Sequence, residues 1–510
     1  MTPDITLTQG QAKVLNQLKS FITSSDRIFA LKGYAGTGKT TLVRFIIKHL
    51  KASNIPYKLL ATTGRAAKIL KDYTGFEANT IHHMIYKFRD LNKDLSEIDT
   101  ENPQADQTGQ LMLVFEPVTI QNEDKPTIYI VDESSMISDT PDPLTTQAKF
   151  GNGKLLTELI EYDKNPKSKF IFVGDPCQLP PITSSNSPAL DPIYLRTTFH
   201  VGVQEAELTQ IMRQTDSNDI TSAAAKIRQM YQVAPFDETA YHGQKVWGRH
   251  LPLSNHKNIC LHYSKEDMLD YYFKMMQQNG RENVIYVCRQ NKTCAQLSNL
   301  IRQRLGYYDT INVGDLLMVI QNQQTTGLMN GDMVEVISIN KDYHHTLQVS
   351  SRYHPYTNLR FIEARVRELF SGTEKTTLIL VNTLEQNNNL DSDQQTGLFI
   401  DFAIRMKHRG ITQKNNMQAF AEALSTDPYL NALRVSYGYA VTCHKAQGGE
   451  WDNVFVDMPG NMTLCPTKEK FQWIYTAMTR AKQNVHFVDE WYIEGSNKGK
   501  VHRVDLTRYR

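Results

Sequence analysis

Residues 33–40 read Gly33-Tyr34-Ala35-Gly36-Thr37-Gly38-Lys39-Thr40, which is a G-x-x-x-x-G-K-T motif. A β-favouring run from Arg27 to Leu31 precedes the motif, and an apolar-periodic segment from Leu42 to Leu50 follows it. Strand, glycine loop and helix in this order predict a phosphate-binding loop rather than a chance glycine turn. Backbone N–H groups and the positive end of the helix dipole would then face the phosphates. Lys39 is expected to reach the β- and γ-phosphates, and Thr40 to hold Mg²⁺.

Length and composition place few limits on function. The chain has 510 residues, of which 40% are hydrophobic and 22% are charged, and its formal net charge is +2. This length predicts more than one domain, and the nearly neutral charge means that any nucleic-acid surface must be local. The 6 cysteines form no C-x-x-C pair, so neither a zinc ribbon nor a disulfide framework is predicted. No signal pattern or membrane-spanning run is visible, which predicts an intracellular protein.

Carboxylates and an amide follow two other apolar runs. The run from Ile128 to Val131 ends in Asp132 and Glu133, and the run from Phe170 to Val173 leads to Gln178. Downstream of a phosphate loop, Asp132 is expected to join the Mg²⁺ shell and Glu133 to deprotonate the attacking water. Gln178 is placed to sense the γ-phosphate. The alternative for each is an ordinary polar loop residue.

Other candidate positions have a structural interpretation beside the functional one. Gln11, ahead of the loop, could read a nucleobase edge or be a surface glutamine. Thr62, Thr63 and Arg65 follow a strand-like run and could contact backbone phosphates, although Thr63 could simply cap a helix. Arg213 could neutralise charge on a transferring phosphate or lie on a helix surface.

The pattern changes in the middle of the chain. A polar stretch from Asp90 to Gln110 precedes the apolar run Leu111 to Phe115, which predicts an insertion with a long loop and a hairpin. From Ile311 onward, short β runs and an Asn-Gly turn predict a small β-barrel. The stretch from Glu385 to Gln395 is rich in Asn, Gln and Asp and predicts a mobile loop. The α/β pattern returns at Val435.

Six motifs follow one another in the order GYAGTGKT, ATTGRAA, VDESSM, GDPCQLPP, TCHKAQGGE and YTAMTRAK, with the Arg213 turn after the fourth. With these motifs in this order the chain resembles a superfamily-1 DNA helicase, most similar to the RecD/Dda/Pif-like branch. The resemblance runs from Gln11 to about Lys482. The UvrD-like branch usually has an aromatic residue where Met212 stands, which disfavours that branch. The residue that stacks on adenine stays unidentified.

The resemblance implies an α/β fold with two RecA-like P-loop domains built on parallel sheets. By this matching the first domain spans residues 1–190 and contains an inserted pin-hairpin subdomain at 86–124. The second domain comprises 191–308 and 430–510, and an SH3-like β-barrel subdomain occupies 309–429.

The resemblance also implies roles for individual residues. The implied catalytic residues are Lys39, Glu133, Gln178, Arg213 and Arg480, the two arginines acting as fingers from the second domain. The implied nucleotide contacts are Gln11, Gly36, Thr37, Gly38, Lys39, Thr40, Thr41 and, at the ribose, Glu450, while Thr40 and Asp132 bind Mg²⁺. The candidate DNA contacts are Thr62, Thr63, Arg65, Thr80, His82, Phe115, Thr442, His444 and Lys445.

The implied activity is ATP-dependent unwinding of DNA by a motor that moves 5′→3′ on a single strand, with ATP and Mg²⁺ as cofactors. Single-stranded and forked DNA are the implied partners, with replication or repair proteins as further candidates, and neither a membrane nor a structural metal is expected. The implied location is the cytoplasm of a bacterial or phage-infected cell. Two alternatives share these motifs: an RNA helicase or ribonucleoprotein remodeller, and a regulatory P-loop ATPase that binds nucleic acid without unwinding it.

Phe115 has two interpretations of equal standing. It is the only aromatic residue in the run Leu111 to Phe115, and aromatic side chains stack on nucleobases. It is therefore the candidate wedge that separates the terminal base pair. The alternative is that this run packs the core of the insertion.

Overall fold

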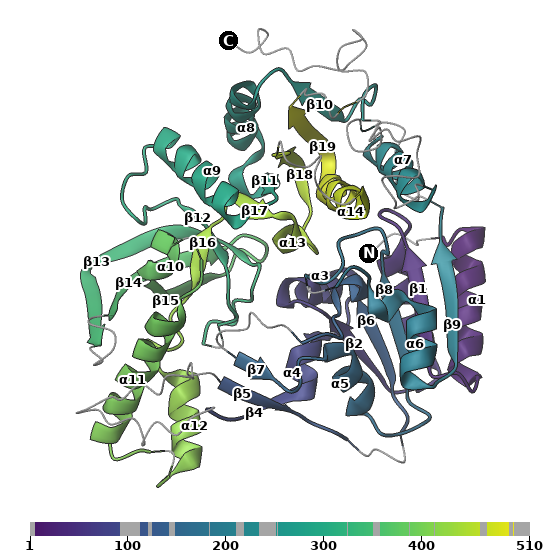
Figure 1. The fold of residues 1–510 in the computed structure, drawn as a ribbon, viewed down its shortest axis with the longest axis horizontal. Coiled ribbons are helices and arrows are strands. Elements are labelled where there is room, and N and C mark those ends of the chain that lie inside the picture. The colour runs from purple at the N-terminus through teal and green to yellow at the C-terminus, as the bar shows by residue number, and fades with distance from the viewer. Residues whose placement is uncertain are drawn as a thin grey trace.

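The computed structural model describes most of the chain, namely residues 6–91, 113–120, 125–141, 148–182, 184–210, 219–233, 251, 253–323, 325–349, 357–386, 388–412, 414–459, 467–488 and 493. These residues form four β-sheets, of which the two largest parallel sheets each carry helices (Figure 1). Within these ranges, no helix is both long enough and apolar enough to cross a membrane.

The first sheet carries the phosphate loop at the end of one strand. Its strands are parallel and lie in the order β3 (Ala78–Thr80), β2 (Tyr57–Ala61), β6 (Ile128–Asp132), β8 (Lys169–Gly174), β1 (Ile28–Gly33) and β9 (Val203–Leu208). Because β9 pairs with β1, this sheet continues past residue 190, where the sequence analysis placed the end of the first domain. The half-exposed polar residues of β9 are typical of an edge strand. The composition of β9 alone does not show to which domain the strand belongs.

Helices cover both faces of the first sheet because alternate strand residues point to opposite sides. In β8, Phe170 and Phe172 pack on one face, whereas Ile171 and Val173 pack on the other. The first face is covered by α4 (Ile81–Ile85), α5 (Leu155–Tyr162) and α6 (Pro192–Phe199), and the second by α1 (Gln9–Thr23), α2 (Lys39–Ala52) and α3 (Gly64–Thr74). In such doubly wound sheets, ligands bind beyond the carboxyl ends of the strands.

A small sheet projects from the first domain beside α4 (Figure 1). It contains β4 (Tyr86–Leu91), β5 (Leu113–Pro117) and β7 (Ala148–Phe150). The strands β4 and β5 pair antiparallel, and β7 adds to β5 in parallel. The strands β4 and β5 fall within residues 86–124, where the hairpin insertion was predicted, whereas β7 lies beyond that range. Residues 92–112, which connect β4 to β5, lie outside the described residues.

The second parallel sheet is assembled from two separate parts of the chain. Its strands lie in the order β10 (Ile259–His262), β19 (Ala481–Val488), β18 (Trp451–Val456), β11 (Val284–Cys288) and β17 (Ala440–Thr442). Its helices are α7 (Ile220–Val233), α8 (Lys265–Asn279), α9 (Asn291–Arg304), α13 (Cys443–Ala446) and α14 (Thr467–Met478). The chain leaves this domain after α9 and re-enters it at β17.

The segment between α9 and β17 forms an antiparallel sheet. Its strand order is β15 (Glu374–Leu380), β14 (Thr357–Glu368), β13 (Met333–Val349), β12 (Leu316–Val319) and β16 (Val435–Tyr437). A bridge between Ile379 and Leu433 joins β15 to the residues just before β16, so the two edges of the sheet meet. This closure is compatible with the predicted small barrel.

The predicted mobile loop from Glu385 to Gln395 is wrong in extent. The helix α10 (Val381–Gln386) ends inside it and α11 (Ser392–His408) begins inside it. Asp391 and Gln394 form a capping box, so polar residues that suggested a loop instead begin a helix. Phe399 and Phe402 then bury the apolar face of α11 against Phe420 of α12 (Met417–Thr426).

The two α/β domains contact one another directly. Tyr34, Cys177 and Leu179 of the first domain belong to the same buried apolar cluster as the second domain's core. In Figure 1, α14 and α13 lie on the side of the second domain that faces the first. The phosphate loop is therefore close to the domain interface.

Candidate active site

The phosphate loop joins β1 to α2 as an open cradle of backbone donors. Gly36 and Gly38 have positive φ angles of 76° and 78°, which favour glycine over other residues. The first intrahelical bond of α2 runs from Leu42 N to Gly38 O, so the N–H groups before Leu42 precede the helical ladder. No side chain caps this helix. Backbone donors at an uncapped helix N-terminus suit a phosphate group.

The side chains of the loop are ordered by its own backbone. Thr37 Oγ1 and Lys39 Nζ both donate to the carbonyl oxygen of Tyr34, at 2.8 and 3.2 Å. The hydroxyls of Thr41 and Tyr73 lie 2.7 Å apart at the exposed start of α2. The Lys39 ammonium is thus held at the loop by a single weak bond that a phosphate can replace.

Gln11 supports the phosphate loop instead of facing a nucleobase. Its Nε2 donates to Thr37 O at 3.1 Å, and its Oε1 accepts from Thr8 N at 3.1 Å. The residue is only 4% exposed. The sequence analysis expected a base-reading amide or a surface residue, and neither matches these contacts. The capping box between Thr8 and Gln11 is what turns the amide inward.

Asp132 is the last residue of β6 and Glu133 directly follows it. Asp132 Oδ1 accepts from Glu133 N at 2.9 Å. Burial raises the pKa of Asp132, the Glu133 carboxylate raises it further, and the Lys39 ammonium partly offsets the rise. Glu133 itself has a left-handed backbone, with φ 52°. Such strain in a non-glycine residue is typical of functional sites. A nearby cation stabilises the ionised form of the buried Asp132 carboxylate. Together with the hydroxyl of Thr40 at the start of α2, this carboxylate fits a Mg²⁺ site.

The loop after β8 carries a third polar group to the same place. Asp175 is fully buried, and burial raises its pKa while the Lys39 ammonium lowers it. Lys39 therefore lies close to both Asp132 and Asp175. Gln178 is 3% exposed, and its Oε1 is buried without a hydrogen-bond partner among the described residues. An unpaired buried amide oxygen calls for a ligand or a water molecule.

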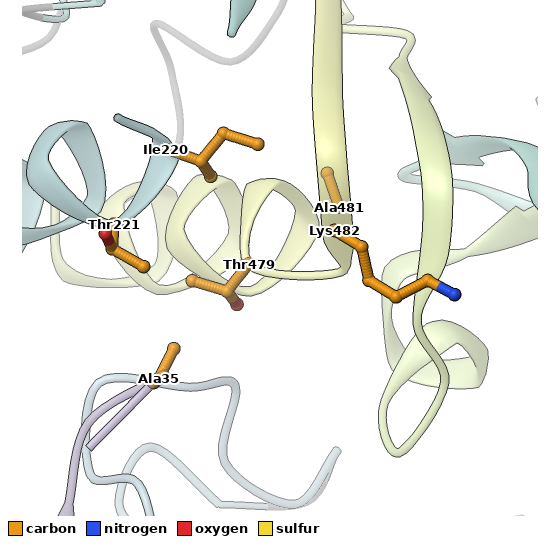
Figure 2. Close-up of a pocket in the computed structure, with 7 residues that line it drawn as sticks. Ala35, Ile220, Thr221, Thr479, Ala481 and Lys482 are labelled. Atoms are coloured by element: carbon orange, nitrogen blue, oxygen red, sulfur yellow. The ribbon is translucent and has the colours of Figure 1, made fainter. Parts of the chain in front are cut away.

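A pocket that is lined by Ala35 and Gly36 lies between the phosphate loop and the second domain. Figure 2 shows Ala35 of the loop on one side of it and Thr221, Thr479 and Lys482 on the other. Thr221 lies at the start of α7, Thr479 in the segment that joins α14 to β19, and Lys482 at the start of β19. The pocket thus lies between two domains that the sequence analysis treated as the halves of one site.

Arg480, the expected finger, lies between the pocket-lining residues Thr479 and Ala481. Its side chain bonds to its own domain. It is 5% exposed, its Nε donates to Thr476 O at 3.1 Å, and its Nη1 donates to Gly449 O at 3.4 Å. In this structure these bonds therefore tie the guanidinium to its own domain. The other expected finger, Arg213, lies outside the described residues.

Arg65 and Glu450 lie where three parts of the molecule meet. Arg65 Nη1 donates to Gly331 O of the barrel at 3.1 Å, and its Cζ lies 4.9 Å from the centroid of the Trp451 ring. Arg65 was predicted to contact DNA, but its guanidinium joins α3, the barrel and β18. Glu450 is exposed and directly precedes Trp451.

Three of the threonines predicted to contact DNA cap short or medium helices. Thr63 Oγ1 accepts from Ala66 N, Thr80 Oγ1 from His83 N, and Thr442 Oγ1 from Lys445 N, which caps α3, α4 and α13. The structural interpretation of Thr63 is therefore confirmed. A capping hydroxyl still has its own hydrogen to donate to a phosphate.

The two histidines predicted to contact DNA are largely uncharged at neutral pH. Burial lowers the pKa of His82 to about 4, and its ring packs edge-on against Phe150 at 5.0 Å between centroids. Burial also lowers the pKa of His444. Lys445 is exposed, and Thr62 is half-buried with its hydroxyl 3.7 Å from Met136 Sδ. Of these four, only Lys445 offers a positive charge to a strand.

Phe115 lies inside the small sheet. It is half-buried in β5, and its ring stacks on that of Phe150 with centroids 4.7 Å apart. It also packs against the core that contains Tyr86 and Ile85 of the first domain. Of its two interpretations, these contacts favour core packing over a wedge.

We expect Phe115→Ala to lower Tm and to depress DNA-stimulated ATPase, translocation and unwinding together. Removing a half-buried ring from a stack costs about 2 kcal/mol, less than a fully buried phenylalanine. The matched control is Phe150→Ala, the stacking partner. If Phe115→Ala instead impairs unwinding alone while Phe150→Ala impairs everything, Phe115 is the wedge after all.

Two second-domain residues at the phosphate loop were not predicted. Arg228 of α7 places its Cζ 3.9 Å from the centroid of the Tyr34 ring, whose hydroxyl bonds Glu207. Tyr475 of α14 bonds the loop at Ala35. Tyr475 lies inside the last motif, YTAMTRAK, and that position could have indicated its contact with Ala35. No motif near Arg228 indicated its contact with Tyr34.

Five cysteines, Cys177, Cys260, Cys288, Cys294 and Cys443, are free and buried. Cys465 lies outside the described residues. Among the residues that the structure describes, no cluster of three or more His, Cys, Asp or Glu side chains could hold a metal ion.

Family comparisons match both α/β domains. The model of a family described as AAA domain matches residues 6–244, and that of the UvrD-like helicase C-terminal domain matches residues 437–488. The first match contains the phosphate loop, Asp132, Glu133 and Gln178. The second contains Arg480 and Tyr475.

Similar proteins come from viruses and bacteria. An uncharacterized protein of Acanthamoeba polyphaga mimivirus is 24% identical, with 94% of this chain and 99% of the relative covered. The ATP-dependent DNA helicase dda of Enterobacteria phage T4 is 23% identical, with 94% and 99% covered. A crystal structure of Pif1 helicase from Bacteroides in complex with ADP-AlF3 and ssDNA has 15% identity and a TM-score of 0.46, with 99% of this chain and 96% of that chain covered.

Proposed function

We propose that this chain, which belongs to the superfamily-1 helicases of the Pif/RecD-like branch, is an ATP-driven DNA helicase that moves 5′→3′ along a single strand. The direction of movement follows the branch. Single-stranded and forked DNA are the proposed partners, and replication or repair proteins are further candidates. The phage origin of one relative supports a role in the cytoplasm of a bacterial or phage-infected cell.

One observation carries this proposal: the phosphate loop of one parallel-sheet domain faces the Thr479–Lys482 segment of another across a pocket. A nucleotide bound there would contact both domains at once. Its hydrolysis can then change how the domains sit, because a ligand shifts a conformational equilibrium only through contacts that differ between the two states. Alternating closure of this kind is what a strand-translocating motor requires.

The chain's own residues supply the chemistry of hydrolysis. Lys39 would bind the β- and γ-phosphates, and Glu133 would take the proton from the attacking water. Gln178, whose Oε1 has no hydrogen-bond partner among the described residues, would orient that water or sense the γ-phosphate. Thr40 and Asp132 would hold Mg²⁺, which when bound neutralises charge on the phosphate oxygens.

The test is strand displacement on DNA and RNA duplexes that carry either a 5′ or a 3′ single-stranded tail. We expect ATP-dependent unwinding of 5′-tailed DNA. Unwinding of RNA duplexes alone would favour an RNA helicase. Nucleic-acid-stimulated ATPase with no strand separation on any substrate would favour a regulatory ATPase and overturn the helicase proposal.

Glu133→Gln is expected to bind ATP but to hydrolyse it about 10²–10⁴-fold more slowly, the usual contribution of a general base. The variant should keep an ATP-dependent grip on single-stranded DNA. Fluorescent-nucleotide binding and single-turnover hydrolysis measure the two steps separately. A variant that no longer binds nucleotide would make Glu133 a ligand or a structural residue instead of the base.

A further inference from the structure

Tyr475 connects the second domain to the phosphate loop through one buried hydroxyl. The hydroxyl accepts a hydrogen bond from Ala35 N at 3.0 Å and donates to Asp175 Oδ2 at 2.7 Å. Tyr475 is 2% exposed and Asp175 is fully buried. A phenol has one hydrogen to donate and lone pairs to accept, so both bonds form together and use different parts of the same group.

The hydroxyl belongs to a row of contacts along one face of α14. Gln472 Nε2 donates to Gln178 O at 3.1 Å, and Thr476 Oγ1 accepts from Leu179 N at 2.9 Å. Positions 472, 475 and 476 are spaced by three and four residues, which places them on one side of a helix. That side therefore docks on the loop that carries Asp175 and Gln178.

The same helix also holds the expected finger. The carbonyl oxygen of Thr476 accepts from Arg480 Nε at 3.1 Å. A displacement of α14 relative to the loop after β8 would thus move Arg480 as well. Within this row of contacts, the Tyr475 hydroxyl is the group that bonds to the phosphate loop itself, at Ala35 N.

We propose that Tyr475 is a positioning residue for ATP turnover, because its hydroxyl fixes α14 against Ala35 and Asp175 and so sets where Arg480 can reach. The inference rests on the proposed function, since it concerns the same nucleotide site. In this proposal the Tyr475 hydroxyl contacts Ala35 and Asp175, and it does not contact the ATP phosphates or the attacking water. Its effect passes through the phosphate loop and through the helix that carries the finger.

The test is Tyr475→Phe, which removes the hydroxyl and keeps the ring. A hydrogen bond to a charged group is strong enough that its loss should lower kcat for ATP by about ten- to hundredfold. The affinity for ATP should change far less, because backbone donors and Lys39 remain. ATPase is measured with saturating oligo(dT), and nucleotide affinity with a fluorescent ATP analogue.

The chain offers a matched control in Tyr439. Its hydroxyl donates to Asp315 Oδ1 at 3.0 Å and accepts from Leu316 N at 3.1 Å, so it bridges a buried carboxylate and a backbone N–H as Tyr475 does. It lies where the second domain meets the barrel, away from the nucleotide pocket. Tyr439→Phe should lower Tm about as much as Tyr475→Phe but leave kcat within about threefold of the wild type, since the lost bond supports only stability.

A double-mutant cycle with Asp175→Asn completes the design. If the hydroxyl acts through Asp175, the two changes should be non-additive in kcat. Additive effects, or a kcat for Tyr475→Phe equal to that of Tyr439→Phe, would overturn the proposal. If Tyr475→Phe does not fold while Tyr439→Phe does, the Tyr475 hydroxyl is a structural contact and the proposal is likewise overturned. A wild type with neither ATPase nor unwinding would instead refute the proposed function.

Discussion

Lys39→Ala is expected to reduce ATP turnover by at least about a thousandfold, at the upper end of what one charge-stabilising donor contributes to catalysis. The ammonium lowers the pKa of both Asp132 and Asp175, and it is the group proposed to bind the β- and γ-phosphates. The fold should survive, because the hydrogen bond of Lys39 Nζ to Tyr34 O, at 3.2 Å, is long and lies within the loop itself. Steady-state ATPase with and without single-stranded DNA measures the loss, and thermal melting measures the fold.

Lys32→Ala is the matched control for the loss of a charge beside the loop. Lys32 lies at the end of β1 and pairs with Glu205, and both side chains are partly exposed at 22% and 47%. An exposed pair of this kind contributes about 0.2–1 kcal/mol, so ATPase should stay close to that of the wild type. If Lys39→Ala retains near wild-type ATPase, the assignment of this loop as the nucleotide site fails.

Arg480→Ala is expected to lower kcat by about 10³–10⁵ while ATP affinity changes little, because an arginine finger stabilises charge that develops only in the transition state. In this structure the guanidinium bonds Thr476 O and Gly449 O of its own domain. To act as a finger it must exchange these bonds for phosphate contacts when the two domains close. Single-turnover hydrolysis and nucleotide titration separate the two parameters.

Arg480 is buried, so its loss could also act through stability, and the melting temperature must be measured beside kcat. Arg480→Lys keeps the charge but cannot reproduce the planar fork of the guanidinium. We expect it to fold with a Tm closer to the wild type and still to lose most of kcat. An effect on KM alone in both variants would be incompatible with a finger.

Local patterns predicted the strands and turns around the phosphate loop, because each of these elements is short and continuous in sequence. The glycine loop, the Asp132–Glu133 pair and the strand before Gln178 are each a buried strand followed by a polar turn. The structure brings the loop, Asp132 and Asp175 around Lys39, as parallel strands that end at one edge must do. The roles assigned to these side chains in turnover remain predictions.

Roles that depend on contacts between distant parts of the chain could not be predicted. Arg65 matches a DNA-contacting motif, but its bonds go to Gly331 and Trp451, which lie far away in sequence. The edge strand β9 is too short and too polar to reveal which sheet it joins. The first turn of α11 falls inside the predicted loop from Glu385 to Gln395, because its capping residues resemble loop composition. The phenylalanines later in α11 are buried against α12, which no local pattern shows.

The order in which the strands appear along the chain also decides when each domain can be completed on the ribosome. Every strand of the first sheet has been made once Leu208 has emerged. The second sheet must wait, because β10 and β11 precede the whole barrel and the α11–α12 pair, whereas β17, β18 and β19 follow them. Domains generally fold as units in the order of synthesis. A nascent chain therefore carries a complete phosphate loop while the apolar strands β10 and β11 still lack their neighbouring strands. During this interval the exposed apolar surface of these strands is the part of the chain that a chaperone would cover.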